Sequence, residues 1–487
     1  MMRAYALFVG GLSIALLCVA GGCDDSVEGR VVAGSGGAGA SGGPGGQGGE
    51  GGQGAGPVTC SFEVASHEDA CPGASCPIVA DVEVRCTEGM LLGSAGIRVV
   101  PAPAGTYLAT SSVMATHFFE IRADGGRPVD GFPLKFIGHA PLLLAQDTDG
   151  AVLAVADQRV GGPNAESLML VRTPGVGFTM EAITTREVGT LSPLDFEVNA
   201  SGVRHVWNEN APLSKDNSLW TSPPNGMWSE SNVGTRDRFT LDASGAPVWI
   251  GRHVTDAGIA LQYGDPPKDL GTPKPYDPNG LGNPLPYRVT HGSPMALDPA
   301  APPIVAVLQH DEGLRVVWPD GDSFGEILVP ETAVPSYVCP PASELPGNPP
   351  CAPDCHETAT GIEHEAFAVT RTQDGAAWLA WVVHSLDYVH VYAETCFEGN
   401  LCFCDDGPPT DVKTKSELVL ARVAPGASQV EKVLTLPIDR VSAFNYNVDF
   451  RGEARLVDVR AFGSEIAVGL RLEDDKGAKL RVLRIKP

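Results

Sequence analysis

The feature that most constrains this chain is a glycine turn between two apolar runs, which recurs along the sequence. One copy is "FTLDASGAPVWIGRH" at residues 239–253, where Gly245 holds the last turn position. Glycine suits that position because φ there is often positive, which costs free energy for a residue with a side chain. Further copies of this β-hairpin place their turn residue at Gly105, Gly150, Gly202, Ala301, Gly375 and Gly463.

A second hairpin follows most copies, as in "SLWTSPPNGMWSESNV" and "LRVVWPDGDSFGEILV". Two hairpins per unit make a four-stranded meander. Four-stranded repeats at roughly 40–50 residues are the signature of a β-propeller. Residues 90–487 resemble propellers as an architecture, although the Gly-His and Trp-Asp marks of WD-repeats are absent. We expect an all-β protein with about seven four-stranded blades over residues 96–487. Two or three ordinary β-sandwiches are the alternative.

The last unit, "VDVRAFGSEIAVGLRLEDDKGAKLRVLRIKP", supplies three strands instead of four. A ring left open there would expose unpaired strand edges, which favour aggregation. The segment "CPIVADVEVRC" in residues 58–95, a Cys-rich N-terminal region, alternates well between apolar and polar residues. We predict that residues 78–85 pair with residues 480–485 and close the ring by strand exchange.

The N-terminal sequence "MMRAYALFVGGLSIALLCVAGGC" has the charged, apolar and small-residue regions of a secretory signal peptide. The small residues directly before Cys23 resemble the lipobox of bacterial lipoproteins, in which Leu is commoner than the Ala20 found here. The resemblance implies removal of residues 1–22 and acylation of Cys23. It also implies an extracytoplasmic protein of the bacterial cell envelope, held to the membrane by its N-terminal lipid. An ordinary secreted protein is the alternative, and we assign neither the inner nor the outer membrane.

A glycine-rich segment follows, so that residues 23–57 form the expected lipid-anchored tether. Residues 34–56 read "GSGGAGASGGPGGQGGEGGQGAG" and cannot bury enough apolar area to offset the loss of backbone entropy. The typical span of such a flexible segment is about 25–30 Å. We therefore expect it to hold a folded domain away from the bilayer.

The cysteines fit an exported protein, because disulfides are the default outside the cytoplasm. Beyond Cys23, they fall into one set of four and one set of six. We expect disulfides among Cys60, Cys71, Cys76, Cys86, Cys339, Cys351, Cys355, Cys396, Cys402 and Cys404, with the connectivity left open. The two Cys-bearing insertions, near residues 330–363 and 385–415, should be neighbours. At least one disulfide should therefore join the 339–355 group to the 396–404 group.

We expect no cofactor and no metal. "CAPDCH" resembles a lengthened haem attachment motif, and "CFC" with His356 is an alternative zinc reading, but exported thiols oxidise readily. "QDTDG" resembles a fragment of the calcium loops in integrin-type propellers, but it offers too few oxygen ligands. The "DASGAPVW" turn resembles the Asp-box of sialidases, which lies away from their active centre.

The repeat sorts the loops onto two faces. Turns between first and second strands are short, whereas the insertions fall at the other strand ends, in "NENAPLSKDN" and residues 264–292, 330–363 and 385–415. Variable loops on one face of a rigid scaffold are where binding usually occurs. Polar residues that close the second strands are the binding-face candidates: Asp157, Arg159, Asn208, Glu209, Arg252, His253, Gln309, His310 and His384. Solvated loop positions are the alternative interpretation.

The formal charge of −25 argues against nucleic-acid binding, which needs a cationic surface. No GxSxG, HExxH or phosphate-binding glycine loop is present, so catalytic residues remain unknown; Glu209 is the one carboxylate that we nominate. We expect a monomeric, non-catalytic binding or scaffold protein with a protein or glycan ligand. The alternative is a hydrolase or lyase that acts on envelope polysaccharide.

Overall fold

The structure is a computed structural model, and the predictions for residues 1–57, Cys71, Ala301 and His310 lie outside the residues that it describes. The compact unit Gly56–Pro487 contains all of the described residues. Within them, no helix has the length and apolarity needed to cross a membrane. The described residues are 59–65, 76–87, 97–102, 105–111, 115–129, 134–135, 143–159, 165–173, 179–187, 191–210, 217–234, 238–242, 244–274, 287–291, 305–309, 313–329, 339, 342, 351–372, 374–397, 401–407, 410–441, 457–474 and 476–487.

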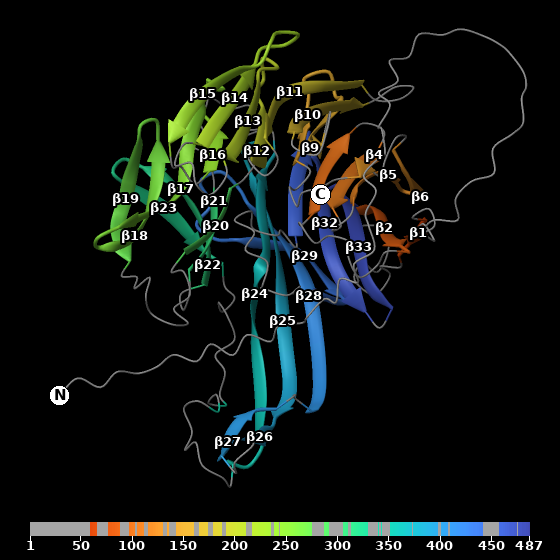
Figure 1. Cartoon of the computed structure of the whole chain (residues 1–487), viewed down its shortest axis with the longest axis vertical. Helices are drawn as coiled ribbons and strands as arrows, with labels where there is room; N and C mark the ends of the chain where they lie inside the picture. The colour runs from red at the N-terminus through yellow and green to blue at the C-terminus, as the bar shows by residue number, and fades with distance from the viewer. Residues whose placement is uncertain are drawn as a thin grey trace, which may run out of the picture. The chain divides into compact units, whose positions relative to one another are not determined.

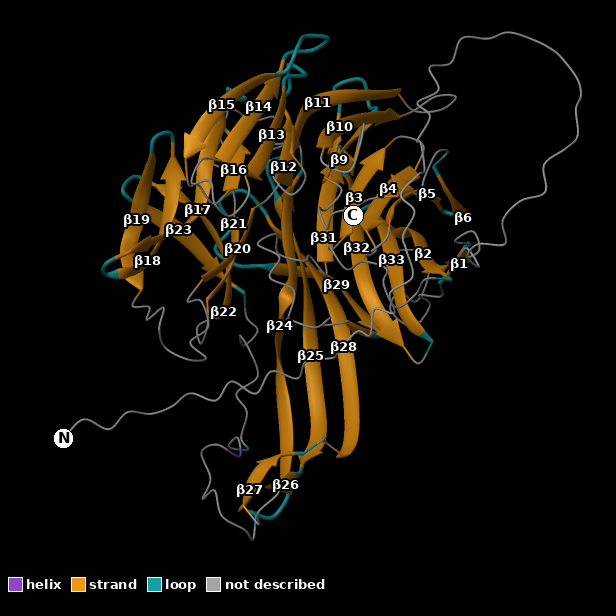
Figure 2. Ribbon diagram, in the orientation of Figure 1, coloured by secondary structure: helices purple, strands orange, loops and turns teal. Residues whose placement is uncertain are grey.

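The fold is all-β, and strands that are consecutive in the chain pair antiparallel into separate sheets (Figure 2). The first sheet contains β3 to β6, at Ile97–Ala102, Gly105–Ser111, Ala115–Arg122 and Gly125–Pro128, with β7 (Leu134–Lys135) paired to β5. The second contains β8 to β11, at Leu143–Gln146, Val152–Arg159, Ala165–Thr173 and Thr179–Glu187. The third contains β12 to β15, at Leu191–Val198, Arg204–Asn210, Asn217–Ser222 and Ser229–Gly234.

The next three sheets repeat this order. The fourth contains β16 to β19, at Arg238–Leu241, Pro247–Thr255, Gly258–Gly264 and Pro267–Lys274. The fifth contains β20 to β23, at Tyr287–His291, Val305–Gln309, Gly313–Asp320 and Ser323–Leu328. The sixth has the order β24-β25-β28-β29, at Cys355–Arg371, Ala377–His390, Thr410–Val423 and Glu431–Ile438. The expected loop at 264–292 is thus partly wrong, because β19 forms the outer strand of its sheet.

The last sheet joins the two ends of the folded unit (Figure 1). The strands β31 (Val457–Phe462), β32 (Glu465–Asp474) and β33 (Gly477–Ile485) are continued by β2 (Ile78–Cys86) and β1 (Cys60–Val64). Ile78 pairs with Ile485 and Val84 pairs with Leu480, so the predicted strand pairing is confirmed. The extra outer strand β1 was not predicted, and the short β30 (Arg440–Val441) pairs with β32.

Most of the recurring glycine turns have the predicted positive φ, but Gly105 does not, because it is the first residue of strand β4. The φ angles of Gly150, Gly202, Gly245 and Gly375 are +84°, +78°, +81° and +81°. In the turn at 242–246, the Asp242 carboxylate accepts hydrogen bonds from the backbone N–H groups of Ser244 and Ala246. The same side-chain turn recurs at Asn199, which accepts from the N–H groups of Ser201 and Val203.

Apolar side chains fill the space between successive sheets. Leu153 and Val155 of the second sheet cluster with Phe196 and Val206 of the third. The first strands of the sheets also contact one another, in the sequence β3–β8–β12–β16, and β20 contacts both β17 and β24. The strand β31 contacts β24 and β3, so the last sheet meets the sheets on either side of it in chain order. The burial of whole strands between layers accounts for the many fully buried Val, Leu and Ile residues.

The sixth sheet is longer than the others, and its extension replaces two predicted loops. Strand β29 pairs with β28 only over residues 416–422, whereas β24, β25 and β28 continue together beyond that point (Figure 1). The hairpin of β26 (Tyr392–Phe397) and β27 (Leu401–Asp406) follows at their far end. We call residues 351–361, 384–397, 401–407 and 410–416 the β-arm. The prediction of loop insertions at 330–363 and 385–415 is wrong for the described residues from 355 onward, because most of them form ladder hydrogen bonds.

Candidate functional site

The predicted binding-face residues all lie in or directly after second strands, except that His310 is not among the described residues. Asp157 and Arg159 lie in β9, Glu209 in β13, Arg252 in β17 and Gln309 in β21. The three candidates whose side chains can be placed have different environments. Asn208 is fully buried in β13, His253 is exposed, and His384 is buried in β25.

Two of these side chains bind partners inside their own sheets. The His253 Nδ1 atom lies 2.9 Å from Asp269 Oδ1 on the outer strand β19. The His384 Nδ1 atom lies 2.9 Å from Ser416 Oγ on β28. The placement of His384 at a strand end is wrong, because β25 continues to His390. The three side chains that can be placed do not support a shared polar pocket, because Asn208 is buried and the two histidines bind partners within their own sheets.

A charged cluster instead lies on the first strands of two sheets that are far apart in the chain. Arg460 on β31 has its NH1 atom 3.5 Å from Glu197 Oε1 on β12. Its Nε atom lies 4.0 Å from Asp458 Oδ1, two residues earlier on β31. Asp195 lies two residues before Glu197, and its charge also acts on Arg460. We call Asp195, Glu197, Asp458 and Arg460 the inner cluster.

The inner cluster is buried, and its single guanidinium faces three carboxylates. Asp458 is 1% exposed, and Asp195 and Glu197 are each 3% exposed. Burial alone would lower the pKa of Arg460, but the charges of Glu197, Asp458 and Asp195 raise it, so the guanidinium stays protonated. Asp458 Oδ2 also accepts a hydrogen bond from the backbone N–H of Val99 on β3, at 2.8 Å. The cluster therefore ties three sheets together through buried, paired charges.

The sequence analysis missed the inner cluster, although the sequence contains a signal for it. "DFEV" at 195–198 and "VDVR" at 457–460 alternate charged and apolar residues within first strands. A first strand packed between sheets should be apolar on both faces. Charges with a period of two in such a strand indicate a polar lining that faces other first strands.

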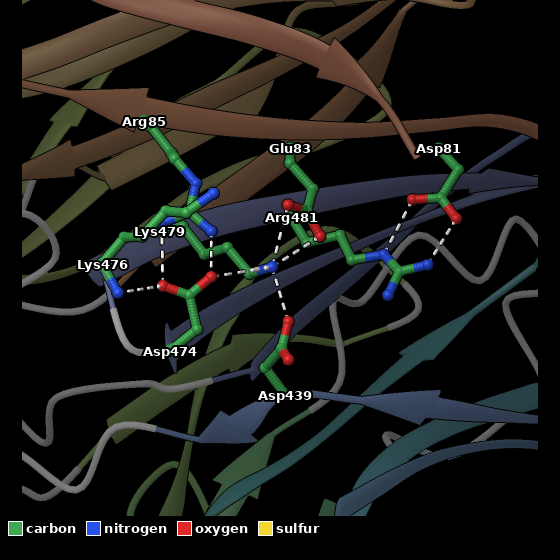
Figure 3. A network of polar contacts seen from close by, with 8 residues as sticks. All are labelled: Asp81, Glu83, Arg85, Asp439, Asp474, Lys476, Lys479 and Arg481. Atoms are coloured by element: carbon green, nitrogen blue, oxygen red, sulfur yellow. Dashed lines mark hydrogen bonds and ion pairs between the residues drawn. The ribbon is translucent and has the colours of Figure 1, made fainter. Parts of the chain in front are cut away.

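A second polar network fastens β2 to β33 (Figure 3). The Asp81 carboxylate accepts two hydrogen bonds from Arg481, from Nε at 2.8 Å and from NH2 at 2.7 Å. Both Glu83 oxygens lie 2.8 Å from the Lys479 Nζ atom. The Arg85 guanidinium binds Asp474 at the end of β32. We call these residues, together with Asp439 beside Lys479, the strand clasp.

The strand clasp follows directly from the alternation of side chains along β2. Asp81, Glu83 and Arg85 lie on one face of the strand, whereas Val82 and Val84 lie on the other and join an apolar core cluster. The hydrogen bond from Arg85 is the largest cause that lowers the pKa of Asp474, to about 2. The charges of the clasp are thus satisfied by one another, which indicates a structural role.

The β-arm is held by disulfides at its far end, where Cys355 pairs with His390 and the β26–β27 hairpin begins. Cys339 is bonded to Cys355, and Cys396 is bonded to Cys402 across β26 and β27. The Cys351–Cys404 disulfide joins the two predicted cysteine groups, so the prediction of a bridge between them is confirmed. In the N-terminal set, Cys60 is bonded to Cys86, and Cys76 is also disulfide-bonded.

The two faces of the β-arm carry different side chains. On one face, His356 Nε2 lies 2.8 Å from Asp387 Oδ1, and Lys413 Nζ lies 3.8 Å from the other oxygen. On the other face, the His390 ring centroid lies 6.5 Å from that of Tyr388 and 4.7 Å from that of Tyr392. Exposed ion pairs contribute only about 0–1 kcal/mol. The order of the arm therefore depends on its strand ladder and its disulfides.

Acidic side chains at two places could suggest metal sites, but their neighbouring atoms already form a disulfide or hydrogen bonds. Glu394 lies close to Cys396 and Cys402, but these sulfurs are joined in a disulfide and are not thiolate ligands. In the "QDTDG" turn, Asp147 Oδ2 accepts from Arg204 NH2 at 3.0 Å, and Asp149 Oδ1 accepts from the N–H of Ala151. These contacts favour the reading of 146–150 as a plain turn.

Comparison with known proteins returned no matching family model and no matching curated protein. Solved structures that resemble the chain include puromycin hydrolase, at 11% identity and a TM-score of 0.35, over 82% of this chain and 57% of that one. The WD40 domain of SCAP from fission yeast is 10% identical with a TM-score of 0.34, over 89% of this chain and 98% of that one. Polysaccharide lyase Uly1 is 9% identical with a TM-score of 0.33, over 80% of this chain and 89% of that one. The chain spans little more than half of puromycin hydrolase, and similarity at these scores is no evidence of a shared activity.

Proposed function

We propose that this chain is a lipid-anchored, extracytoplasmic β-propeller that serves as a non-catalytic binding or scaffold protein of the bacterial cell envelope. Seven blades are proposed, six from the sheets of chain-consecutive strands and the seventh from β31, β32, β33 and β2. The contacts of β31 with both β24 and β3 support a closed ring. In this proposal β2 closes the ring, and the strand clasp and the Cys60–Cys86 disulfide hold that closure.

The proposed anchor is Cys23, followed by the glycine-rich tether. The disulfides of the folded unit are consistent with export, because thiols in the cytoplasm are kept reduced. Neither the membrane nor the leaflet is part of the proposal. The proposed protein is a monomer that binds a protein or a glycan and no nucleic acid.

The observation that carries the non-catalytic assignment is the burial of the inner cluster. A polysaccharide hydrolase needs two carboxyl groups that flank the scissile bond, and a lyase needs an accessible base. Asp195, Glu197 and Asp458 are the carboxylates that converge near Arg460, and each is at most 3% exposed. A polymer cannot reach them unless the first strands move apart. A polysaccharide hydrolase or lyase remains the alternative proposal.

The β-arm is the proposed binding element. Its strands extend past the sheet that they belong to, and disulfides fix a segment that adds no large apolar core. Rigid presentation of a surface lowers the entropy lost on binding, which is a physical reason to keep such an extension. The Tyr388–His390–Tyr392 face supplies aromatic rings for contact with a protein or glycan.

Two measurements test this proposal. The purified chain is incubated with acidic and neutral polysaccharides, and the release of reducing ends and unsaturated products is followed. No turnover is expected; turnover that disappears in Glu197→Gln would establish the enzyme instead.

Crosslinking in intact cells then compares the native chain with a variant in which a two-residue turn replaces residues 391–407 and Cys351 is Ser. This deletion is feasible because the N–H of Gly407 donates to the carbonyl of Val391 at 2.8 Å. Crosslinks that persist unchanged without the tip would exclude residues 391–407, Tyr392 among them, from the binding element.

A further inference from the structure

A cavity of about 340 Å³ lies where the first and last sheets meet. Its walls come from β2 and β33 on one side and from β4 and β5 on the other, so it sits beside the strand pairing that joins the two ends of the unit. Val79, Ile121 and Val482 supply apolar wall, and Arg122, Arg484 and Lys486 supply positive charge. We call this the junction cavity.

A β-bulge in β2 sets the position of Val79 at this cavity. The pairing of β2 with β33 shifts register between Ile78 and Ala80, which leaves Val79 as the extra residue. Its neighbours are 7% and 8% exposed, whereas Val79 itself is 45% exposed. A bulge turns a side chain away from the regular alternation and is over-represented beside functional sites. Here it places an exposed apolar side chain at a cavity wall.

A buried hydroxyl also borders the cavity. Thr106 on β4 is 1% exposed, and its Oγ1 atom has no hydrogen-bond partner among the described residues. Leaving a buried hydroxyl unpaired costs about 1–3 kcal/mol. A ligand could reach this fully buried atom only after a shift of the cavity wall, so the site offers an apolar wall and positive charge without rearrangement.

The charges at the cavity are unbalanced toward positive. Arg484 is bonded to Glu465, and Arg122 is bonded to Glu120 behind the wall. Lys486 is exposed and forms no ion pair with any described residue. With Glu120 counted, three cations meet two carboxylates, so Lys486 leaves a net positive charge at the cavity in a chain whose formal charge is −25, which favours an anion.

We propose that the junction cavity binds a small amphipathic carboxylate. The apolar part would lie against Val79, Ile121 and Val482, and the carboxylate would pair with Lys486. At roughly 30 Å³ per non-hydrogen atom, which is the share of a water molecule in the liquid, the cavity holds about ten such atoms. Octanoate has this size and both of these properties. The site is separate from the β-arm and does not depend on the proposed function.

Isothermal titration calorimetry with sodium octanoate tests the site. The full chain carries Cys23→Ser, so that no detergent is needed for a lipid anchor. Saturable octanoate binding is expected, and 1-octanol, which lacks the charge, should bind at least tenfold more weakly, as expected for loss of a charge-assisted hydrogen bond. Lys486→Gln should weaken octanoate binding about tenfold for the same reason.

Lys476→Gln is the matched control, because Lys476 is exposed and precedes β33, whereas Lys486 follows it. This variant should bind octanoate as the parent does. Val79→Ser should weaken the binding of both octanoate and octanol. If circular dichroism shows that this variant does not fold, the comparison of Lys486→Gln with Lys476→Gln still tests the proposal. The proposal is overturned if octanoate shows no saturable binding, if octanol binds equally well, or if the two lysine variants bind alike.

Discussion

Asp81 and Arg481 lie 400 positions apart in the sequence and form a two-bond ion pair, with N···O distances of 2.8 and 2.7 Å. Glu83 is the residue directly opposite Arg481 in the strand register, so the pair with Asp81 is diagonal. Asp81 is 1% and Arg481 is 5% exposed. The strand that joins the N-terminal segment to the last sheet therefore carries buried charge on one face and valines on the other.

Removal of one partner of this pair should be strongly destabilising. Asp81→Asn leaves Arg481 buried without its counter-charge, which should lower the free energy of unfolding by about 3–5 kcal/mol. Asp81→Leu combined with Arg481→Leu should cost less than either single change, because no unpaired charge remains. Urea unfolding of the parent, Asp81→Leu, Arg481→Leu and the double leucine variant gives the coupling energy. Additive single and double effects would show that the pair is not coupled.

Two buried histidines should make stability depend on pH. Burial lowers the pKa of His117 and of His205 from 6.5 to about 4. Between these values the unfolded chain binds more protons than the folded one, so stability falls as the pH decreases from about 6.5 to about 4. At pH 5 each histidine should cost about 2 kcal/mol relative to pH 7.

The measurement is the urea midpoint at pH 7 and pH 5, a range that lies above the ordinary pKa of carboxyl groups. His117→Leu with His205→Leu should remove most of the difference between the two midpoints. The same pH dependence in this double variant would assign the effect to other groups.

Gly245→Ala should destabilise the turn at 242–246 more than a matched change elsewhere. Its φ of +81° disfavours a side chain, and an added Cβ would lie 2.8 Å from Asn199 Nδ2. Gly463 has a φ of +59°, and a Cβ added there would meet no atom within 4 Å, so Gly463→Ala should cost only about 1 kcal/mol. Thermal unfolding of the two variants compares these costs. Equal losses would mean that Asn199 moves aside freely.

Loss of the Cys351–Cys404 disulfide should loosen the β-arm. This bridge spans 53 residues and the tip bridge Cys396–Cys402 spans 6. Loop-closure entropy predicts about 4 kcal/mol for the longer and about 2 kcal/mol for the shorter. Replacing both cysteines of a bridge by serine should accelerate proteolysis within 391–407, and more so for Cys351–Cys404 than for Cys396–Cys402. Cleavage elsewhere before the arm would contradict this local effect.

The lipid anchor is tested by Cys23→Ser. If Cys23 is acylated, the native chain should fractionate with membranes and the variant should appear in the soluble fraction. Cys18→Ser, in the predicted signal peptide, is the control and should stay with the membranes. A Cys23→Ser protein that remains in the membrane fraction would exclude this anchor.

The sequence by itself determined the local geometry of the repeat. A positive φ at Gly150, Gly202, Gly245 and Gly375 follows from short-range sterics, and so do the strands on either side. The pairing of β2 with β33 was also predictable, because an alternating strand at one end matched a missing strand at the other. The bridge between the two cysteine groups followed from the adjacency of their insertions.

Only the tertiary structure decided which polar residues meet. Arg460 and Glu197 are 263 positions apart, and their contact depends on how first strands from different sheets face one another. The β-arm was read as loops because short, polar, β-branched runs have no apolar partner in the sequence to indicate a strand. Local sterics fix turns and strands, whereas the contacts of buried charges depend on packing between sheets, which no spacing along the chain encodes.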